Sequence, residues 1–192
     1  MKNDNEANRN RIRDILNQLH NKSIEDKIDR YLELEHQQII GYHYFSDASS
    51  ECIFCYRDGY FISTVMMSHA INEGIIKFIT ERNRISRNNK DGSTKSIEDL
   101  INELFNRNII SEKCRYSHLQ IYRSFRADIH HMNPIVVNIP FKDLAKQNII
   151  ALSVIEREIF GYDFINGAIS PHQPIYWDIS EENMTTAYIR GI

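Results

Sequence analysis

Apolar residues recur every three or four positions along most of the chain, a spacing that places them on one face of an α-helix. The most apolar segment is residues 61–83, FISTVMMSHAINEGIIKFITERN, which contains no proline and a single glycine. We expect it to form a long buried helix. Its core face would consist of Phe61, Val65, Met66, Ile75, Phe78 and Ile79. Residues 86–95, SRNNKDGSTK, are rich in turn formers and are expected to be a linker.

Start signals predict further helices on both sides of this segment. Residues 5–21 carry isoleucine and leucine at helical spacing, and Ser23 followed three residues later by an aspartate resembles a capping box. Ser96 and Ser111 are closely followed by acidic residues and are expected to begin two more helices. A last helix is expected over residues 141–162, because large apolar residues recur along one side of it.

Residues 163–192 have no helical period. We interpret them as an extended tail, with or without a short strand, that packs on the helices through Tyr176 and Trp177. Together these patterns predict an all-α fold, an up-and-down bundle of about four to six helices. Residues 1–57 would form an N-terminal helical extension, residues 58–162 the bundle and residues 163–192 the tail.

The net charge of −3 excludes a bulk polycation, so any binding of nucleic acid must come from a local basic patch. Two stretches without acidic residues carry four fixed positive charges each, and they run from Arg82 to Lys90 and from Lys113 to Arg126. Each stretch either attracts a polyanion or is simply a solvated helix end or loop.

The chain has three cysteines, of which Cys52 and Cys55 form one C-x-x-C pair and Cys114 stands alone. A structural zinc site usually needs a second pair of ligands at related spacing, so we interpret this pair as plain packing residues. The odd count and the lack of a signal-peptide pattern favour a reducing cytoplasm. The apolar runs are too short for a membrane span, and no phosphate-binding or metal-binding motif is evident, so we expect no membrane contact and no cofactor.

The stretch SFRADIHHMNP, residues 124–134, carries the candidate chemistry. Histidine is the side chain best suited to transferring protons near neutral pH. Arginine is the side chain best suited to holding a phosphate through two parallel hydrogen bonds. The two together indicate chemistry on a phosphodiester. We expect the stretch to continue the helix that begins near Ser111 and to end at Pro134.

On such a helix the motif residues would divide between the two flanks of a narrow apolar stripe. The stripe would consist of Tyr122, Phe125, Ile129 and Met132. Two polar sets would flank it: Arg123, Arg126 and His130 on one side, and Ser124, Asp128 and His131 on the other. Lys113 and Arg115, nearer the start of the helix, would attract a polyanion. The other interpretation is a pair of half-exposed histidines near a helix C-terminus, where positive charge is mildly favoured.

Residues 126–131, RADIHH, resemble the signature of HEPN domains (higher eukaryotes and prokaryotes nucleotide-binding), in which a histidine follows an arginine by four to six residues on the penultimate long helix of a small bundle. The nuclease part of the kinase-extension nucleases is similar. The order of elements over about residues 58–162 also resembles the family. The shared elements are a long apolar helix with an internal glutamate (here Glu73), a polar linker, a capped helix, the Arg/His helix and a closing helix that ends in IFG, residues 159–161.

This resemblance implies metal-independent cleavage of RNA, in which the 2′-hydroxyl attacks the neighbouring phosphorus. Arg126 would hold the phosphate, and His131, or His130 as second choice, would act as general base or acid. The candidate substrate-binding residues are Arg123, Asp128, Lys113 and Arg115. The family forms two-fold dimers, which implies a homodimer whose two motif helices share one groove, with an antitoxin or another defence protein as a further partner.

Two features leave the function open. His69, Glu73 and Lys77 form a polar stripe on the long apolar helix, in which Glu73 either orients a motif residue or belongs to an ordinary surface pair. Family nucleases usually carry a polar residue, often asparagine, directly after the arginine, but this chain has Ala127. A non-catalytic HEPN-like module that binds RNA, a nucleotide or a protein, and a purely structural dimeric bundle, are therefore the alternatives to a ribonuclease.

Overall fold

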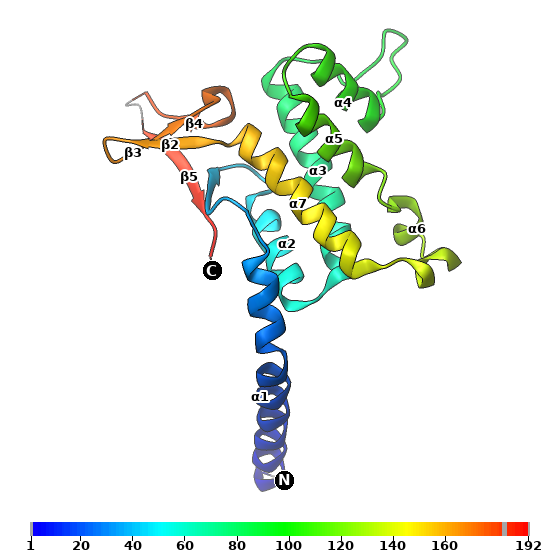
Figure 1. The fold of residues 1–192 in the computed structure, drawn as a ribbon, viewed down its shortest axis with the longest axis vertical. Helices are drawn as coiled ribbons and strands as arrows, with labels where there is room; N and C mark the ends of the chain where they lie inside the picture. The colour runs from blue at the N-terminus through cyan, green and yellow to red at the C-terminus, as the bar shows by residue number, and fades with distance from the viewer. Residues whose placement is uncertain (1, 182–183, 192) are drawn as a thin grey trace. The chain divides into compact units, whose positions relative to one another are not determined.

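The helix α3 (Phe61–Arg82) is the element around which the other helices of the main unit pack (Figure 1). It contacts α2 (Ser46–Asp58), α4 (Ile97–Asn106), α5 (Glu112–Tyr122) and α7 (Phe141–Ile159). The prediction of a long buried helix is confirmed, because Val65, Ile75 and Ile79 are fully buried. Gly74 lies where a side chain would press on the ring of Phe45, so this glycine permits close packing.

This computed structural model describes residues 2–181 and 184–191, with the side chains of residues 2–4 left aside. The chain forms two units, residues 1–34 and residues 35–192. In the first unit α1 (Lys2–Leu32) runs without interruption through Ser23, where we expected a new helix to begin. The hydroxyl of Ser23 donates to the carbonyl of His20 instead of capping a helix, which is how serine bonds inside a helix.

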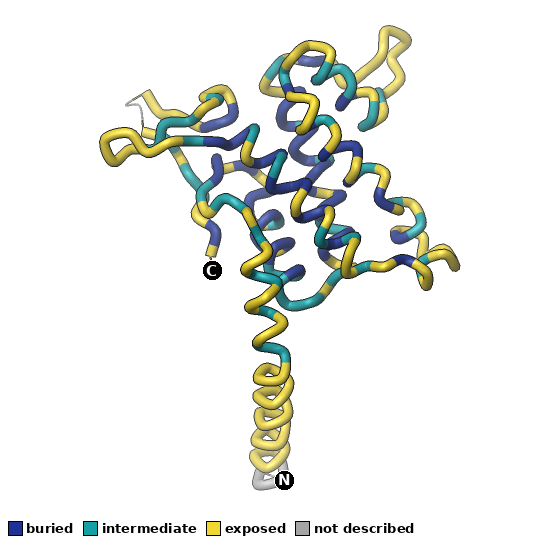
Figure 2. The backbone as a smooth tube through the Cα atoms, in the orientation of Figure 1, coloured by how far each residue is buried: buried dark blue, intermediate teal, exposed yellow. Residues whose placement is uncertain are grey.

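The second unit begins at Glu35, whereas the expected bundle began at residue 58. Residues 35–57 belong with the bundle because α2 packs on α3 and α7, and because β1 (Ile39–Gly41) pairs with a strand near the end of the unit. Buried backbone is concentrated in the helices of this unit (Figure 2).

The start signals of α4 and α5 are confirmed. Ser96 accepts a hydrogen bond from the backbone of Asp99, whose side chain bonds back to Ser96, so the pair forms a capping box. Ser111 likewise accepts from the backbone N–H of Cys114 at the start of α5. The last helix, α7, ends at Ile159, three residues before the expected boundary.

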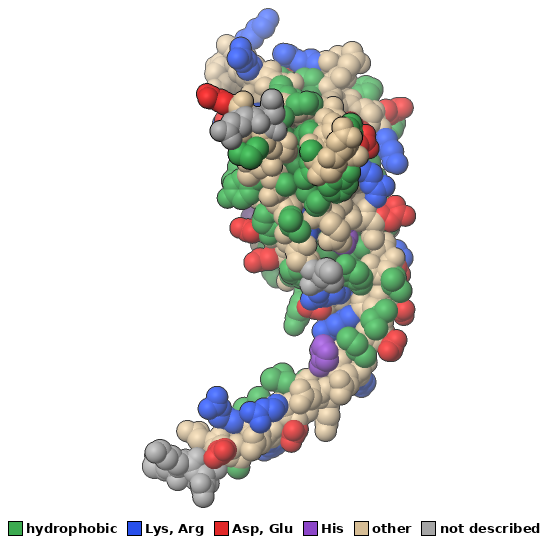
Figure 3. Space-filling view, turned by 90° about the vertical axis from the view of Figure 1, so that its left-hand side faces the viewer, with side chains coloured by type: hydrophobic (Ala, Val, Ile, Leu, Met, Phe, Trp, Pro, Cys, Tyr) green, Lys and Arg blue, Asp and Glu red, His purple; other side chains and the backbone are tan. Residues whose placement is uncertain are grey.

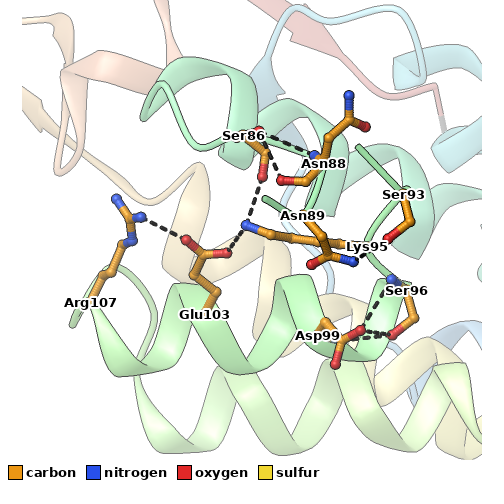
Figure 4. Close-up of polar contacts among 9 residues, drawn as sticks. All are labelled: Ser86, Asn88, Asn89, Ser93, Lys95, Ser96, Asp99, Glu103 and Arg107. Atoms are coloured by element: carbon orange, nitrogen blue, oxygen red, sulfur yellow. Dashed lines mark hydrogen bonds and ion pairs between the residues drawn. The ribbon is translucent and has the colours of Figure 1, made fainter. Parts of the chain in front are cut away.

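The linker between α3 and α4 forms a small turn that is joined to α4 by an ion pair (Figure 4). Asn88 and Thr94 form a β-bridge, and Lys95 donates to the carbonyl of Ser86. The same ammonium lies 2.6 Å from Glu103 on α4, which also pairs with Arg107 at 2.6 Å. None of the three residues of this Arg–Glu–Lys group lines the pocket of the candidate site.

The C-terminal region forms small antiparallel sheets, so the expectation of a purely all-α fold is wrong there, although the chain is mostly helical. One sheet pairs β2 (Tyr162–Ile165) with β3 (Ala168–Pro171). The other has the order β1-β5-β4, with β5 (Thr185–Ile189) between β1 and β4 (Asp178–Ile179). Figure 3 shows apolar side chains gathered on this side of the molecule, and the exposed ones on the strands include Phe164, Ile165, Ile179 and Ile189.

The tail packs on the bundle through Tyr176 and Trp177, as predicted, and both side chains are buried. Tyr176 closes the short helix η2 (Pro174–Tyr176), lies beside Phe78 of α3 and accepts a hydrogen bond of 2.8 Å from Asn83. The tail is further fixed by Arg190, whose guanidinium lies 2.5 Å from the carboxylate of the buried Glu156 on α7. The hydroxyl of Ser49 on α2 also donates to this carboxylate.

Within the described residues, no helix is both long and apolar enough to cross a membrane.

Candidate functional site

The Arg/His motif does not continue the preceding helix, so the expected single helix up to Pro134 is wrong. Helix α5 ends at Tyr122, and the motif forms a separate short helix, α6 (Arg126–His130). Between them Phe125 has a left-handed backbone, with φ of 56°. Such a conformation costs a residue with a side chain about 1–2 kcal/mol, so tertiary contacts have to hold the break in place.

The break changes which residues face the core. Ile129 is fully buried as predicted, but Phe125 and Met132 are exposed, so they do not belong to a core stripe. Ser124, expected on an exposed flank, is buried. The assignment of the motif to two opposite flanks of one helix is therefore wrong, because no such helix exists across residues 111–134.

The polar residues of the motif instead line one open pocket of about 680 Å³. The candidates that line it are Arg123, Arg126, Asp128, His130 and His131, together with Tyr122, Phe125 and Ala127. Both histidines are exposed, so solvent and a ligand can reach them. The two imidazoles and two guanidinium groups give the pocket the proton donors and acceptors, and the positive charge, that a phosphodiester needs.

Glu73 contacts both neighbours that the sequence suggested for it. Its carboxylate lies 2.7 Å from the ammonium of Lys77 and 2.8 Å from the guanidinium of Arg126. Partial burial would raise the pKa of Glu73, but the hydrogen bond from Lys77 and the charge of Arg126 together lower it. Glu73 is therefore an anion that fixes Arg126 at the edge of the pocket.

The remaining candidates have other contacts. Arg123 forms an ion pair with Glu98 of α4 as well as lining the pocket. Asp128 accepts a hydrogen bond of 2.9 Å from Asn133 and so closes the turn after α6.

The structure does not bring Lys113 and Arg115 to the pocket, whose lining residues begin at Tyr122. Arg115 donates to Asn102 and lies over the ring of Phe105, so it is engaged in the contact between α4 and α5.

A buried polar cluster, which we call the corner cluster, lies beside the motif and joins His69, Ser124, Asn148 and Ser68. Nε2 of His69 is 2.7 Å from the hydroxyl of Ser124. The amide nitrogen of Asn148 is 3.1 Å from the same hydroxyl and 2.8 Å from that of Ser68. The ring of His69 lies 6.5 Å from that of His130. Burial, together with the charges of Arg126 and His130, lowers the pKa of His69 to about 4.

The sequence patterns did not reveal this cluster, although His69 lies in the polar stripe and Ser124 in the motif. Asn148 is the signal that was available, because it is a polar residue inside an apolar helical segment and is fully buried. Buried polar groups need partners, so such an asparagine indicates an internal hydrogen-bond network.

A second buried histidine lies nearby without touching the motif. His118 on α5 is fully buried, and its Nδ1 is 2.6 Å from the side-chain oxygen of Asn72 on α3. Burial lowers the pKa of His118 to about 3. The pair links α3 with α5 but makes no bond to Ser124 or to α7.

The cysteines fit the interpretation of packing residues. Cys52 and Cys114 are buried, and burial raises the pKa of both thiols and of the thiol of Cys55. Among the residues that the structure describes, no three histidine, cysteine or acidic side chains are grouped closely enough to hold a metal ion.

Comparisons of the chain with protein-family models, with curated proteins and with solved structures found no match. The resemblance to HEPN domains therefore rests on the sequence motif and the order of the elements, and the motif lies on a five-residue helix where the family pattern has a long one.

Proposed function

We propose that this protein is a metal-independent ribonuclease of the HEPN type, which acts as a homodimer in the cytoplasm. The observation that carries the proposal is the convergence of Arg126, His130 and His131 on one solvent-open pocket. A defence or toxin–antitoxin system, in which an antitoxin would cover this pocket, is the setting that such an enzyme fits.

The proposed reaction divides the work between the two residue types. One imidazole, that of His131, removes the proton from the 2′-hydroxyl, whose oxygen then attacks the adjacent phosphorus. Arg126 donates to the phosphate oxygens and stabilises the charge that develops there. A second imidazole, from His130 or from the partner subunit, gives a proton to the departing 5′-oxygen. The products are a 2′,3′-cyclic phosphate and a free 5′-hydroxyl.

Exposed apolar residues beside the pocket support the dimer. Phe125 on the pocket wall and the nearby Met132, Ile135 and Val137 are all exposed, the last at 86%. The segment η1 (Pro134–Asn138) that carries two of them directly follows the motif. A two-fold contact here would bury this surface and bring the two pockets together, because a two-fold axis places identical residues opposite each other.

The test of the chemistry is cleavage of single-stranded and structured RNA in EDTA. We expect Arg126→Ala, His130→Ala and His131→Ala each to lower the rate by about 10²-fold or more, the range found for single catalytic groups. Arg107→Ala is the matched control, because Arg107, like Arg126, pairs with a glutamate that also binds a lysine, but it lies outside the pocket. Equal rates for the pocket variants and the control would overturn the proposal.

The test of the dimer is sedimentation of the wild type and of Val137→Asp. We expect the variant to be monomeric and to cleave RNA more slowly. Ile189→Asp, which places the same charge on an exposed residue of β5, should remain a dimer. A wild type that sediments as a monomer at all concentrations would remove the composite site from the proposal.

The second candidate is a binding module without turnover. Two observations favour it: Ala127 stands where family nucleases carry a polar residue, and Glu73 already neutralises the guanidinium of Arg126. A tight complex with RNA that weakens steeply with salt, without cleavage, would identify this function.

A further inference from the structure

We infer that His69, Ser124 and Asn148 are positioning residues that hold the corner between α5 and α6 and thereby aim Arg126 and His130 into the pocket. The inference deepens the proposed function and rests on it for its catalytic consequence. Its structural content, that these three side chains fix the motif helix, can be tested even without activity.

The directions of the hydrogen bonds make Ser124 the hub of the corner cluster. The hydroxyl has one proton, which it donates to the carbonyl of Ile121 at 2.6 Å. Its oxygen therefore accepts from Nε2 of His69 and from the amide of Asn148. One oxygen atom thus joins α3, the end of α5 and α7.

The backbone at this corner needs such support. Phe125 holds its left-handed conformation without the glycine that usually allows it, and its side chain is 40% exposed. The residue is therefore only partly packed. The preceding residue, Ser124, is the one whose side chain is buried and bonded on three sides. Strained backbone persists only where the surrounding structure fixes it, and here the fixing contacts belong to Ser124.

The corner directly precedes residues that line the pocket. Arg126 is the first residue of α6 and follows Phe125 in the chain, so a rotation at the corner would swing its side chain. His69 precedes Glu73 by one turn of α3. The same helix therefore carries the imidazole that bonds to Ser124 and the carboxylate that fixes Arg126. On the other side of α6, Ile129 is anchored in the core. The motif helix is therefore held at both ends.

The protonation state of His69 follows from these contacts. Burial, together with the nearby Arg126 and His130, lowers the pKa of His69 to about 4, so its ring is neutral at physiological pH. Its single proton lies on Nε2, because the hydroxyl of Ser124 has no proton left to give. Nδ1 is buried and has no hydrogen-bond partner among the described residues. His69 thus acts as a fixed donor to Ser124 and not as a proton carrier.

The variants His69→Gln and His69→Asn separate this role from simple packing. The amide nitrogen of glutamine reaches the place of Nε2 and can still donate to Ser124, whereas the shorter asparagine cannot. The variant Ser124→Ala removes the hub with little change in volume. His118→Gln and His118→Asn are the matched controls, because His118 is equally buried between α3 and α5 but bonds only to Asn72 and not to the corner.

Two measurements are needed. The first is hydrogen exchange of the amides of Ile129 and His131, which bond to the carbonyls of Phe125 and Ala127. The second is the kcat and KM of RNA cleavage. We expect His69→Asn and Ser124→Ala to speed exchange in residues 126–131 by about tenfold or more. They should lower kcat by about 10–10²-fold, the scale of a misplacement of about 1 Å. His69→Gln should restore both values.

The outcomes distinguish this inference from the proposed function. The His118 variants should lower global stability and leave exchange in residues 126–131 and kcat unchanged. If His69→Asn and Ser124→Ala behave like them, the inference is wrong even when Arg126→Ala is inactive. If the wild type cleaves no RNA, the proposed function is wrong, and the exchange measurement alone decides whether the corner cluster positions the motif.

Discussion

Helix α7 contributes to two buried polar clusters that differ in charge and in reach. Asn148 belongs to the neutral corner cluster, and Glu156, about two turns further along the helix, belongs to an ionic cluster with Arg190 and Ser49. All three members of the ionic cluster are buried.

The comparison shows how one helix can serve two purposes. The ionic cluster joins three segments that are far apart in the chain, so it ties the tail to the bundle. Both of its charged groups are buried, so removing either partner should lower the free energy of unfolding strongly. The corner cluster uses neutral groups and fixes one bend. We therefore expect changes in the ionic cluster to affect global stability, and changes in the corner cluster to affect mainly the motif.

The largest expected effect comes from Glu156→Ala, which leaves the guanidinium of Arg190 buried without its partner. We expect the free energy of unfolding to fall by about 3–5 kcal/mol, measured by urea denaturation. The double variant Glu156→Ala with Arg190→Met should be more stable than the single variant. A loss below about 1 kcal/mol would show that this pair does not hold the tail.

Asn148→Ala should have a smaller global effect. It removes two hydrogen bonds, to Ser124 and Ser68, and we expect a loss of about 1–3 kcal/mol in the same measurement. RNA cleavage should fall further than this loss alone explains, because the corner is released while the protein stays folded. If RNA cleavage falls no further than the loss of stability explains, the contrast between the two clusters disappears.

The corner cluster should also respond to acid. The folded-state pKa of His69, about 4, lies below its ordinary value of 6.5, so the unfolded chain binds the proton more readily. Its contribution to stability is complete above pH 6.5 and is lost as the pH falls toward 4. We expect His69→Gln to reduce the slope of stability against pH in this window by about 1 kcal/mol per pH unit. An unchanged slope would contradict a neutral, buried His69.

The smallest expected effect is that of Arg107→Ala, which removes an exposed ion pair with Glu103. Solvent screens such pairs, so the free energy of unfolding should change by less than about 1 kcal/mol. A thermal melt of this variant beside Glu156→Ala would show that burial, and not the presence of an ion pair, decides the contribution. A change as large as that of Glu156→Ala would contradict this view.

Local signals in the sequence were sufficient to locate three of the helices. The apolar period located α3, and serine followed by an acidic residue located the starts of α4 and α5. Tyr176 and Trp177 were predicted to anchor the tail, and both are buried.

The rest depended on contacts between distant residues. No glycine or proline marks the break at Phe125, because the bend is fixed by a serine that bonds to two other helices. The pairing of β1 with β5 joins strands too short to show an alternating pattern. One missed element did have a local signal. Asn166 and Gly167 both have positive φ between β2 and β3, and Asn-Gly between apolar residues is a strong hairpin signal.

The candidate site shows the same division. The motif residues were expected to act together, and Arg126, His130 and His131 line one pocket. The helical-wheel assignment failed because it assumed a continuous helix. Lys113 and Arg115, chosen for charge alone, do not line the pocket, because charge in a sequence does not reveal which neighbour a side chain will contact.

The pairing of β1 with β5 has a consequence for synthesis. A nascent chain that has just exposed α7 to solvent outside the ribosome already contains Glu156 but has neither Arg190 nor the strand that pairs with Ile39. Until then the buried ion pair between Glu156 and Arg190 cannot form. Because Arg190 follows β5, the tail can be tied to α7 by this ion pair only after β5 and residue 190 have been translated.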